Sequence, residues 1–481
     1  MRGVEPCRVG FQRERTRMTS LFGHSVRSEG LALYMAEAIV CFAVVYLLSA
    51  STGGSGSPGA FQAASLAAVL ALSTGVAAAA TGMHTPTGWR KARGLLTGTL
   101  LTALLLTPLA WVAVEFLRVD LGGSATGGAA SPAAAVILLS AAGTGGVLVT
   151  RLLFLGVSRT GLFTQPIAVL DGSRAALVKL PPAGPTASEE PFRVALRLGA
   201  GEALAEAGRP EAAVGLSAPE LRSRGIRWVV APQPKAVPAA LRKSWTEAGV
   251  KLVGEVEFLE RLSGRVDLEA LEPDWLETAR GAHMGRAEAF VCRSFDVIVS
   301  LALLLLTLPL TVLAAIAIRI DSPGPIFYRQ ARVGQGGRII HLTKLRSMRV
   351  DAEVGGAPQW ATRRDPRVTR VGRFLRLTRI DEIPQVLNVL KGDMAFIGPR
   401  PERPAFVEQL SLAIPHYADR AVVKPGITGW AQVNFPYGAS VDDARQKLTY
   451  DLYYVRRRSL FLDLLILVAT VRVILFQEGS R

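Results

Sequence analysis

Two adjacent acids, Asp381 and Glu382, stand among arginines in a chain of 481 residues whose formal net charge is +16. An ionised carboxylate can attack phosphorus or hold a divalent metal ion, and nearby guanidinium groups can neutralise phosphate oxygens. The same guanidinium groups are expected to lower the carboxyl pKa, so that the nucleophile stays charged at neutral pH. Because an isolated Asp-Glu pair is usually an ordinary surface feature or ion pair, the surrounding motifs must decide. The pattern favours phosphate chemistry.

The composition indicates a membrane protein. Hydrophobic residues make up 49% of the chain and are concentrated in a few long runs. A pI near 10.3 suits anionic lipid headgroups, phosphorylated substrates or nucleic acid. The basic residues lie beside the apolar runs and no recognised nucleic-acid module is present, so we expect no nucleic-acid partner. The cysteines show neither paired spacing nor histidine partners, which predicts no disulfide framework and no zinc site.

Residues 1–160 form the first predicted region, with four transmembrane helices at the apolar runs of about 31–50, 61–83, 95–117 and 133–156. The basic amino end and the loop that carries Arg90, Lys91 and Arg93 mark one side of this bundle as cytoplasmic. The alternative is that some alanine-rich runs are buried helices of a soluble domain, because small residues weaken the hydropathy signal.

Residues 161–280 form the second predicted region, an α/β accessory domain followed by a linker. Short β-rich runs alternate with helical stretches rich in alanine and glutamate, which predicts a small Rossmann-like fold with a parallel sheet. The glycines between residues 199 and 208 form no dinucleotide-binding fingerprint after a strand, so no cofactor is predicted there. A structural or regulatory role is the expectation for this domain.

The third predicted region, residues 281–481, begins with an apolar run at about 297–318. As a straight helix this run would be roughly 33 Å long, enough to cross a bilayer. Both flanks are basic, however, and Pro309 near the middle would break or bend the helix. A re-entrant helix that dips into one leaflet would leave both flanks on the cytoplasmic side. The alternative is a kinked helix that spans the membrane.

The remainder of this region is soluble in character, basic and rich in loops. Its glycines and prolines predict tight turns near a site. The apolar run from Leu460 to Phe476 is interrupted by charges and has hydrophobic residues at helical spacing, which predicts an interfacial amphipathic helix. An ordinary packing helix fits the same pattern.

Seven ordered motifs extend from about residue 290 to the carboxyl end. They are Phe295-Asp296, Ser322–Tyr328, Lys344–Met348, Asp381–Gln385 with Asn388–Met394, Gly398–Glu402, Pro425–Gln432 and Lys447–Tyr454. With these motifs the segment closely resembles the bacterial sugar transferase family, the monotopic polyprenyl-phosphate phosphoglycosyl transferases. The amino-terminal helices and the α/β region look like those of the longer members. The stretch 250–275 resembles exopolysaccharide-associated members found with exosortase systems.

The resemblance implies a mainly α catalytic domain and a reaction in two halves. A sugar 1-phosphate moves from a UDP-sugar to the enzyme with release of UMP, and then to undecaprenyl phosphate. At the matching positions Asp381 would be the nucleophile, aided by a Mg²⁺ cofactor, and Glu382 would orient metal or substrate, so that both are candidate metal ligands. Arg376 could pair with the polyprenyl phosphate, because a guanidinium matches phosphate oxygens in bidentate fashion. Arg400 and Glu402 are expected to line the nucleotide and metal side.

Other polar residues of the motifs could bind phosphate or could have a structural role. Lys344 and Arg346 are further phosphate-binding candidates, and the alternative is that they brace the dyad or face anionic lipid. Gln385 and Asn388 are expected to hydrogen-bond locally instead of contacting substrate. His416 is expected to be structural, because direct attack by an ionised carboxylate needs no general base.

The sequence departs from the family pattern in two places. Leu308 stands where a serine commonly precedes the kink proline, and Cys292 occupies a position that is often basic. Pro309 keeps the steric cause of a break. The serine hydroxyl that could bond a freed carbonyl is missing, so the sequence leaves the kink geometry open.

The resemblance implies a multi-pass enzyme of the bacterial inner membrane that contacts membrane lipid and faces the cytoplasm with its active site. It would initiate synthesis of an exopolysaccharide or another glycoconjugate, with the transferred sugar unresolved. Two alternatives are a membrane glycosyl transferase that releases UDP and a non-catalytic scaffold for polysaccharide assembly. No residue pattern fixes the oligomeric state, and a homodimer is compatible with the predicted surfaces.

Overall fold

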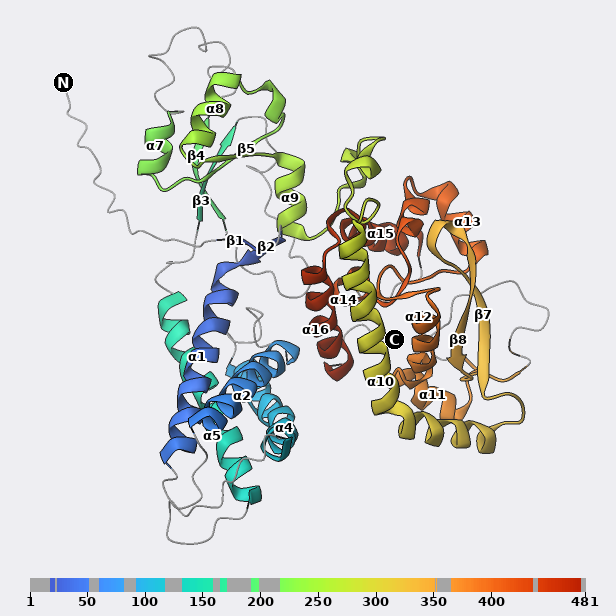
Figure 1. The fold of residues 1–481 in the computed structure, drawn as a ribbon. Coiled ribbons are helices and arrows are strands. Elements are labelled where there is room, and N and C mark those ends of the chain that lie inside the picture. The colour runs from blue at the N-terminus through green and yellow to red at the C-terminus, as the bar shows by residue number, and fades with distance from the viewer. Residues whose placement is uncertain are drawn as a thin grey trace, which may run out of the picture. The chain divides into compact units, whose positions relative to one another are not determined.

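A computed structural model of the chain describes residues 18–21, 24–51, 60–81, 92–116, 132–158, 165–170, 192–198, 217–350, 352, 365–435 and 440–476. The chain folds as two compact units that divide between Leu262 and Ser263 (Figure 1). Near the amino end, two short strands, β1 (Met18–Leu21) and β2 (His24–Arg27), pair with each other.

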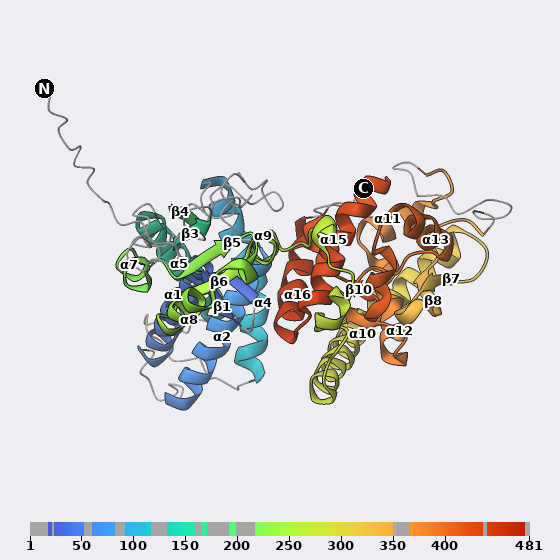
Figure 2. The same cartoon turned by 90° about the horizontal axis from the view of Figure 1, so that it is seen from above.

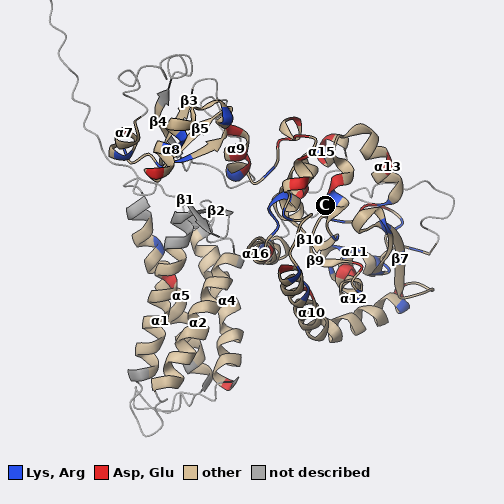
Figure 3. Ribbon diagram, turned by 45° about the horizontal axis from the view of Figure 1, so that its top comes forward, with Lys and Arg blue, Asp and Glu red and all other residues tan. Residues whose placement is uncertain are grey.

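Four apolar helices form a bundle in the first unit. They are α1 (Ser28–Ser51), α2 (Ala60–Ala80), α4 (Ala92–Phe116) and α5 (Pro132–Ser158). Buried residues such as Val45, Leu66 and Leu106 meet in one cluster between these helices. Large apolar side chains such as Leu72 and Leu100 are also exposed on the outside, and Figure 3 shows few charged residues along the bundle. A bundle that is apolar both inside and outside is typical of membrane helices.

Helix length agrees with the predicted spans for most of the bundle. Within α2, α4 and α5, the segments Ala60–Ala79, Leu95–Glu115 and Val136–Phe154 are long and apolar enough to cross a membrane. The described apolar stretch of α1, Leu33–Ser49, is shorter. The basic amino end before residue 18 and the basic loop at residues 82–91 lie outside the described residues.

A buried ion pair lies inside the bundle, which the sequence patterns did not predict. Arg151 Nε on α5 lies 2.6 Å from Glu37 Oε1 on α1, and the two side chains are 0% and 1% exposed. Charged groups among apolar membrane helices are stable only when paired. The pair therefore ties the first and last helices of the bundle together.

The α/β domain of the first unit has four parallel strands in the order β4-β3-β5-β6. The strands are β3 (Gln165–Leu170), β4 (Phe192–Leu198), β5 (Trp228–Ala231) and β6 (Lys251–Gly254), and the helices are α7 (Ala218–Ser223), α8 (Ala239–Glu247) and α9 (Glu255–Ser263). Alternate residues of β5 belong to two separate apolar clusters, as expected of a parallel sheet covered on both faces. The parallel sheet is confirmed. The glycines between 199 and 208 lie outside the described residues, and the Rossmann-like assignment stays a prediction.

The second unit is mainly helical, with little strand. Its antiparallel hairpin β7–β8 lies beside α13 (Figure 2), and β9 pairs with β10 in parallel. The elements are α10 (Arg286–Asp321), β7 (Phe327–Val333), β8 (Ile339–Leu345), α11 (Arg370–Leu377), the 3₁₀ segment η6 (Ile380–Gln385), α12 (Val386–Lys391), β9 (Ala395–Ile397), α13 (Pro404–Ala413), η7 (Tyr417–Val422), β10 (Gly426–Thr428), α14 (Trp430–Asn434), α15 (Val441–Arg457) and α16 (Leu460–Phe476).

The carboxyl-terminal helix α16 begins and ends at the residues that the sequence predicts. Its residues Leu462 and Ile466 are buried in the main core of the second unit. Leu464 and Ile474 on the same helix are exposed. One face of α16 therefore packs as an ordinary helix, while another leaves apolar side chains exposed.

The segment after residue 262, predicted as a linker, is part of the second unit. Val266 and Trp275 are 1% and 3% exposed and belong to the core formed with α15 and α16. The backbone N–H of Val266 donates to Thr449 O at 3.0 Å, and Trp275 Nε1 donates to Asp419 Oδ2 at 3.0 Å. Because these contacts bury the segment against other elements of the second unit, we place the domain boundary near 263 instead of the predicted 281.

Helix α10 bends and returns to the unit from which it leaves. Its first half is held by Arg293, which donates to the carbonyls of α12. Its last turns pack through Ala314 and Ile318 against β8, α11 and η6. A straight helix of its 36 residues would extend roughly 54 Å, so both ends could not meet one compact unit without the bend visible in Figures 1 and 3. Between the two packed ends, large side chains such as Leu305 and Leu306 are exposed.

The hydroxyl groups near the bend come from threonines that the sequence patterns did not single out. Thr307 Oγ1 donates to Leu303 O at 2.6 Å, and Thr311 Oγ1 donates to Thr307 O at 2.9 Å. Side-chain bonds of this kind to the preceding turn bend helices. With Pro309 between them, they give the helix a cause for bending although Leu308 replaces the usual serine.

Candidate active site

The acidic dyad, Asp381 and Glu382, lies in η6 directly after a sharp turn of the backbone. Thr369 Oγ1 caps α11 by accepting from Gly372 N at 2.9 Å, and the helix ends at Leu377. Arg379 then adopts a left-handed conformation with φ 60°, which redirects the chain into η6. The neighbouring Ile380 is buried in an apolar cluster with residues of β8 and α11. The dyad is therefore placed by packed elements on both sides.

Glu382 is held by basic side chains from two distant motifs. Its Oε1 atom lies 3.0 Å from Lys344 Nζ, and Arg400 donates from both terminal nitrogens, one of them 3.3 Å from Oε2. Burial alone would raise the pKa of Glu382, but the charges of Arg400 and Lys344 outweigh it and hold the pKa well below its usual range. Glu382 is thus a permanently ionised anchor between β8 and the Gly398–Glu402 motif.

The pKa of Asp381 is shifted in the opposite direction from that of Glu382. Burial, followed by the charge of Glu382, raises its pKa to about 6 against the opposing charges of Lys344, Arg376 and Arg400. The expectation that the surrounding arginines lower the pKa of the nucleophile is therefore wrong for Asp381, because burial outweighs them, and correct for Glu382. Two adjacent carboxyl groups with separated pKa values are suited to different roles.

The raised pKa predicts how activity depends on pH. If Asp381 acts as the nucleophile, its carboxyl group would be mostly protonated and unreactive below pH 6, so kcat/KM should rise about tenfold per pH unit up to roughly pH 6 and then level off. A cation bound to this carboxylate would move the rise to lower pH. Initial rates of nucleotide release between pH 5 and 8.5 measure this rising part of the pH profile. A rate that stays flat from pH 5 to 7 at low magnesium would contradict the assignment.

Arg376 lies on α11 near the dyad, where a residue that binds a substrate phosphate would have to lie. Its Nε donates to Ser347 Oγ at 3.0 Å, which orients the guanidinium, and its charge acts on Asp381. The close approach of α11 to the Ser347 backbone requires a glycine, because a Cβ at Gly372 would lie 2.0 Å from Ser347 O. The structure thus brings Arg376 to the dyad.

Arg346, also predicted as a phosphate ligand, is used elsewhere. Its terminal nitrogens donate to Pro323 O at 2.6 Å and to Ser322 O at 2.7 Å, and the side chain is buried. The charges that act on it are those of Arg319 and Asp321, not those of the dyad. Arg346 therefore braces the Ser322–Gly324 loop after α10, and the structure does not bring it to the site.

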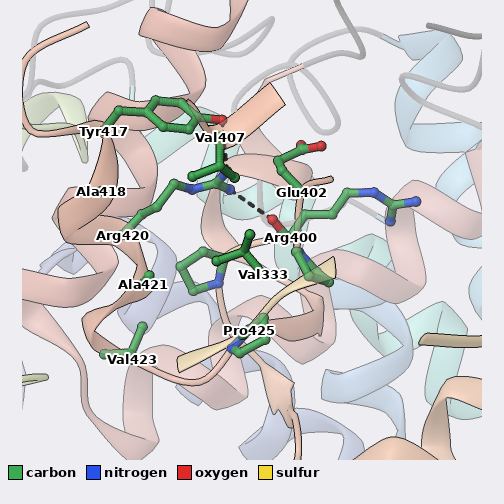
Figure 4. A pocket seen from close by; sticks show the side chains of 13 residues that line it. Val333, Arg400, Glu402, Val407, Tyr417, Ala418, Arg420, Ala421, Val423 and Pro425 are labelled. Carbon is green, nitrogen blue, oxygen red and sulfur yellow. Dashed lines mark hydrogen bonds between the residues drawn. The ribbon is translucent and has the colours of Figure 1, made fainter. Parts of the chain in front are cut away.

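Arg400, which contacts Glu382 through its guanidinium, also lines a pocket (Figure 4). Arg420 reaches into it from η7, donates to Arg400 O at 2.9 Å and lies 2.6 Å from Asp451. Glu402 at the rim lies 3.5 Å from Arg332 NH1. The lining consists of Val333, Gly334, Pro399, Arg400, Pro401, Glu402, Val407, Tyr417, Ala418, Arg420, Ala421, Val423 and Pro425.

Arg420 and Arg332 are site residues that the sequence patterns missed. Neither lies in a motif that suggested chemistry, and each is identified only by its contacts with the Gly398–Glu402 segment. Arg400 is shared, because its backbone lines the pocket while its guanidinium holds Glu382. Arg400 therefore connects the pocket with the dyad.

Asn388 and His416 have the local roles that the sequence predicts. Asn388 donates to His341 O at 2.7 Å and accepts from Thr343 N at 3.1 Å, so its amide fixes α12 to β8. His416 Nδ1 lies 2.9 Å from Asp419 Oδ2, which also accepts from Trp275, and this arrangement is structural. Gln385 is 2% exposed, and its Nε2 has no hydrogen-bond partner among the described residues.

The donor set of the dyad is compatible with magnesium. No group of three or more His, Cys, Asp or Glu side chains suited to a metal occurs among the residues that the structure describes. Magnesium is commonly held by only one or two carboxylates together with substrate phosphates and water. Asp381 forms no hydrogen bond with another described side chain and could supply one ligand, whereas Glu382 would share its oxygens with Lys344 and Arg400. The cofactor stays a prediction.

Comparison with known proteins identifies the family. The family model described as bacterial sugar transferase matches residues 287–477. "Exopolysaccharide production protein PSS" of Rhizobium leguminosarum bv. phaseoli is 39% identical over 188 residues, which cover 37% of this chain and 92% of that relative. The chain belongs to the bacterial sugar transferase family.

Other relatives of this bacterial sugar transferase are named for their reactions. A UDP-glucose:undecaprenyl-phosphate glucose-1-phosphate transferase of Caulobacter vibrioides is 45% identical over 190 residues, 39% of this chain and 71% of the relative. A UDP-N-acetylgalactosamine-undecaprenyl-phosphate N-acetylgalactosaminephosphotransferase of Aeromonas hydrophila is 45% identical over 225 residues, 47% of this chain. The chain spans about half of the length of that relative, 52%.

Proposed function

We propose that this bacterial sugar transferase moves a sugar 1-phosphate from a UDP-sugar to undecaprenyl phosphate and releases UMP. The relatives named above carry this reaction class in their names. The observation that carries the proposal is that the two carboxyl groups of the dyad have different partners. Glu382 is held by Lys344 and Arg400, whereas the carboxylate of Asp381 has no such partner among the described side chains and would be available for attack.

In the first half of the proposed reaction, an Asp381 oxygen attacks the phosphorus that carries the sugar. A bond forms between that oxygen and phosphorus, and the bond from phosphorus to the bridging oxygen breaks, so that its electron pair leaves with UMP. An oxygen of undecaprenyl phosphate then attacks the same phosphorus and displaces Asp381. Neither half needs a general base, because both attacking oxygens are already ionised. A Mg²⁺ ion held by the dyad and the diphosphate would neutralise charge on the leaving group.

The other residues of the site position charge for this reaction. Lys344 and Arg400 fix Glu382, and their charges would also act on the phosphate groups of the substrates. Arg376, oriented by Ser347, is placed to pair with phosphate oxygens. Arg400 and Glu402 at the pocket rim are placed to meet the nucleotide side of the donor. Arg346 acts on the site only through the loop that it braces.

The bend of α10 supports a re-entrant path through one leaflet. Both ends of the helix pack on the same catalytic unit, while the side chains between them are apolar and exposed. A helix seated in this way would keep the site at the level of the lipid phosphates, so that undecaprenyl phosphate need not leave the bilayer. We accordingly place the enzyme in the inner membrane with its active site facing the cytoplasm.

This placement predicts the outcome of a topology experiment. Reporters inserted before residue 286 and after residue 321 should both report the cytoplasm, since the helix should leave the bilayer on the side from which it enters. The measurement is cysteine accessibility or reporter activity at the two positions in whole cells. Opposite locations would show that α10 crosses the membrane. Replacing Pro309 with Leu serves as the matched variant, because it should shift the second reporter toward the outside.

Nucleotide release tests the proposed function directly. Purified membranes receive Mg²⁺, undecaprenyl phosphate and a panel of UDP-sugars that includes UDP-glucose and UDP-N-acetylgalactosamine. UMP from one donor would support the proposal and identify the sugar. Release of UDP would instead favour a glycosyl transferase, and no nucleotide from any donor would favour a scaffold. Initiation of an exopolysaccharide, suggested by the Rhizobium relative's name, and a homodimer stay predictions.

A further inference from the structure

Arg379, two residues before the nucleophile, has an unusual backbone conformation. Among the described residues other than glycine, only Arg379 and His416 have a positive φ. An L-residue with a Cβ pays roughly 1–2 kcal/mol for this left-handed conformation, and glycine would supply the same turn without that cost. Strained residues of this kind cluster at functional sites. The side chain of Arg379 must therefore contribute something that glycine cannot.

The folded protein itself makes little use of the Arg379 side chain. Its NH1 atom lies 3.9 Å from Glu382 Oε2, beyond hydrogen-bond distance, and the side chain is 42% exposed. Glu382 already forms ion pairs with Lys344 and Arg400 at shorter distances. An exposed ion pair at this distance adds little stability. Stability therefore does not account for an arginine at this position.

The charges around the dyad leave a surplus that an anion would balance. Four cationic side chains (Lys344, Arg376, Arg379 and Arg400) act on the two carboxylates of the dyad. Arg400 and Lys344 are committed to Glu382, and Arg376 is tied through Nε to Ser347. Arg379 is the member of this group without a hydrogen bond from its side chain to another described residue. Its planar fork of donors matches phosphate oxygens.

We propose that Arg379 is a substrate-contacting residue whose guanidinium binds a phosphate group beside Asp381. The inference rests on the proposed function and deepens it by assigning a phosphate ligand that the motifs did not single out. The side chain lies beside the dyad, with its Nη1 atom 3.9 Å from Glu382 Oε2. The phosphate belongs either to the diphosphate of the donor or to the lipid acceptor, and the two sources share the same chemistry.

The test compares Arg379→Gly with Arg379→Lys in the full chain. Glycine removes the charge and the strain together, so the variant should keep or raise the melting temperature while phosphate-dependent steps slow about 10- to 100-fold. Lysine keeps the charge and should recover part of the rate. His416→Gly makes the same backbone change at the other left-handed residue and should leave the rate within about twofold. An Arg379→Gly variant with wild-type rates and KM values would overturn the proposal.

Separate half-reactions distinguish the two phosphate sources. A slower burst of UMP without acceptor would assign Arg379 to the donor diphosphate. An unchanged burst with a raised KM for undecaprenyl phosphate would assign it to the acceptor. Binding gives a readout that does not depend on turnover, because inorganic pyrophosphate should raise the melting temperature of the wild type more than that of Arg379→Gly. If the wild type releases no UMP, the proposed function fails, and the pyrophosphate shift still decides whether Arg379 binds phosphate.

Discussion

Asp381→Asn should abolish UMP release and the covalent labelling of the protein by a sugar phosphate, with a loss of at least about 10⁴-fold in turnover. An amide of the same shape cannot donate the electron pair that forms the bond to phosphorus. The measurement is UMP release together with transfer of label from a donor carrying ³²P on the sugar-linked phosphate. Labelling that persists in the variant would show that another residue is the nucleophile.

The same substitution should stabilise the protein, which separates loss of chemistry from loss of folding. The folded-state pKa of Asp381 is raised from 3.8 to about 6, so the folded state binds the proton more tightly and loses stability as pH rises through that window. At pH 7.5 the ionised carboxylate therefore costs as much as about 3 kcal/mol, which the neutral amide avoids. The variant should melt at a higher temperature than the wild type at pH 7.5 and at a similar temperature near pH 4.

Glu382→Gln is the matched control, because the sign of its effect should be reversed. The folded-state pKa of Glu382 is depressed, so its ionised form stabilises the fold above the unfolded-state pKa, and that contribution is lost as pH falls. Removing its charge leaves Lys344 and Arg400, which are 15% and 31% exposed, without their anionic partner, at a cost of about 1.5–3 kcal/mol. A lower melting temperature than that of Asp381→Asn is expected at pH 7.5. Equal effects of the two substitutions would contradict the division of roles.

The sequence was sufficient to predict that the dyad lies among basic side chains, because this depends on residue type and on recognisable motifs. Asp381 and Glu382 are adjacent, and the basic residues that act on them lie in recognisable motifs. The helix at Leu460–Phe476 was predicted for a similar reason, since a long apolar run with helical spacing has few alternatives. In each case the information is contained in one short segment.

The direction of the Asp381 pKa shift was mispredicted because burial is not a local property of the sequence. The arginines nearby in sequence predicted a lower pKa, but tertiary packing removes Asp381 from water and outweighs them. Arg346 was misplaced for a related reason. Lys344 and Arg346 would point to the same side of a continuing strand, but β8 ends at Leu345, and Arg346 turns instead to the Ser322–Gly324 loop.

The boundary of the catalytic domain was set too late in the sequence because the partners of the supposed linker lie far along the chain. The segment with Trp275 has a proline, acidic residues and no clear period, which is typical of a linker. The Trp275 side chain nevertheless donates a hydrogen bond to Asp419, which lies 144 residues further along the chain. A single sequence gives no signal for a contact of that range.

The revised boundary predicts a large difference between two truncated chains. A chain that begins at Ser263 keeps Val266, Trp275 and Ala279 in the core and should fold and release UMP in detergent. A chain that begins at Gly281 lacks all three. Loss of the Trp275 side chain alone is worth about 3–5 kcal/mol, which approaches the whole stability of a typical domain. The shorter chain should therefore be largely unfolded or melt far lower, with little activity.

The test measures melting temperature, resistance to proteolysis and UMP release for both chains in the same detergent. The results decide where the domain begins. Trp275→Ala in the Ser263 chain is the matched variant, because it removes the principal buried side chain without shortening the protein. It should melt between the two truncations if packing of this segment stabilises the domain. Equal stability and activity of the two chains would restore the boundary near 281. If the Ser263 chain folds but is inactive, the first unit is required for catalysis.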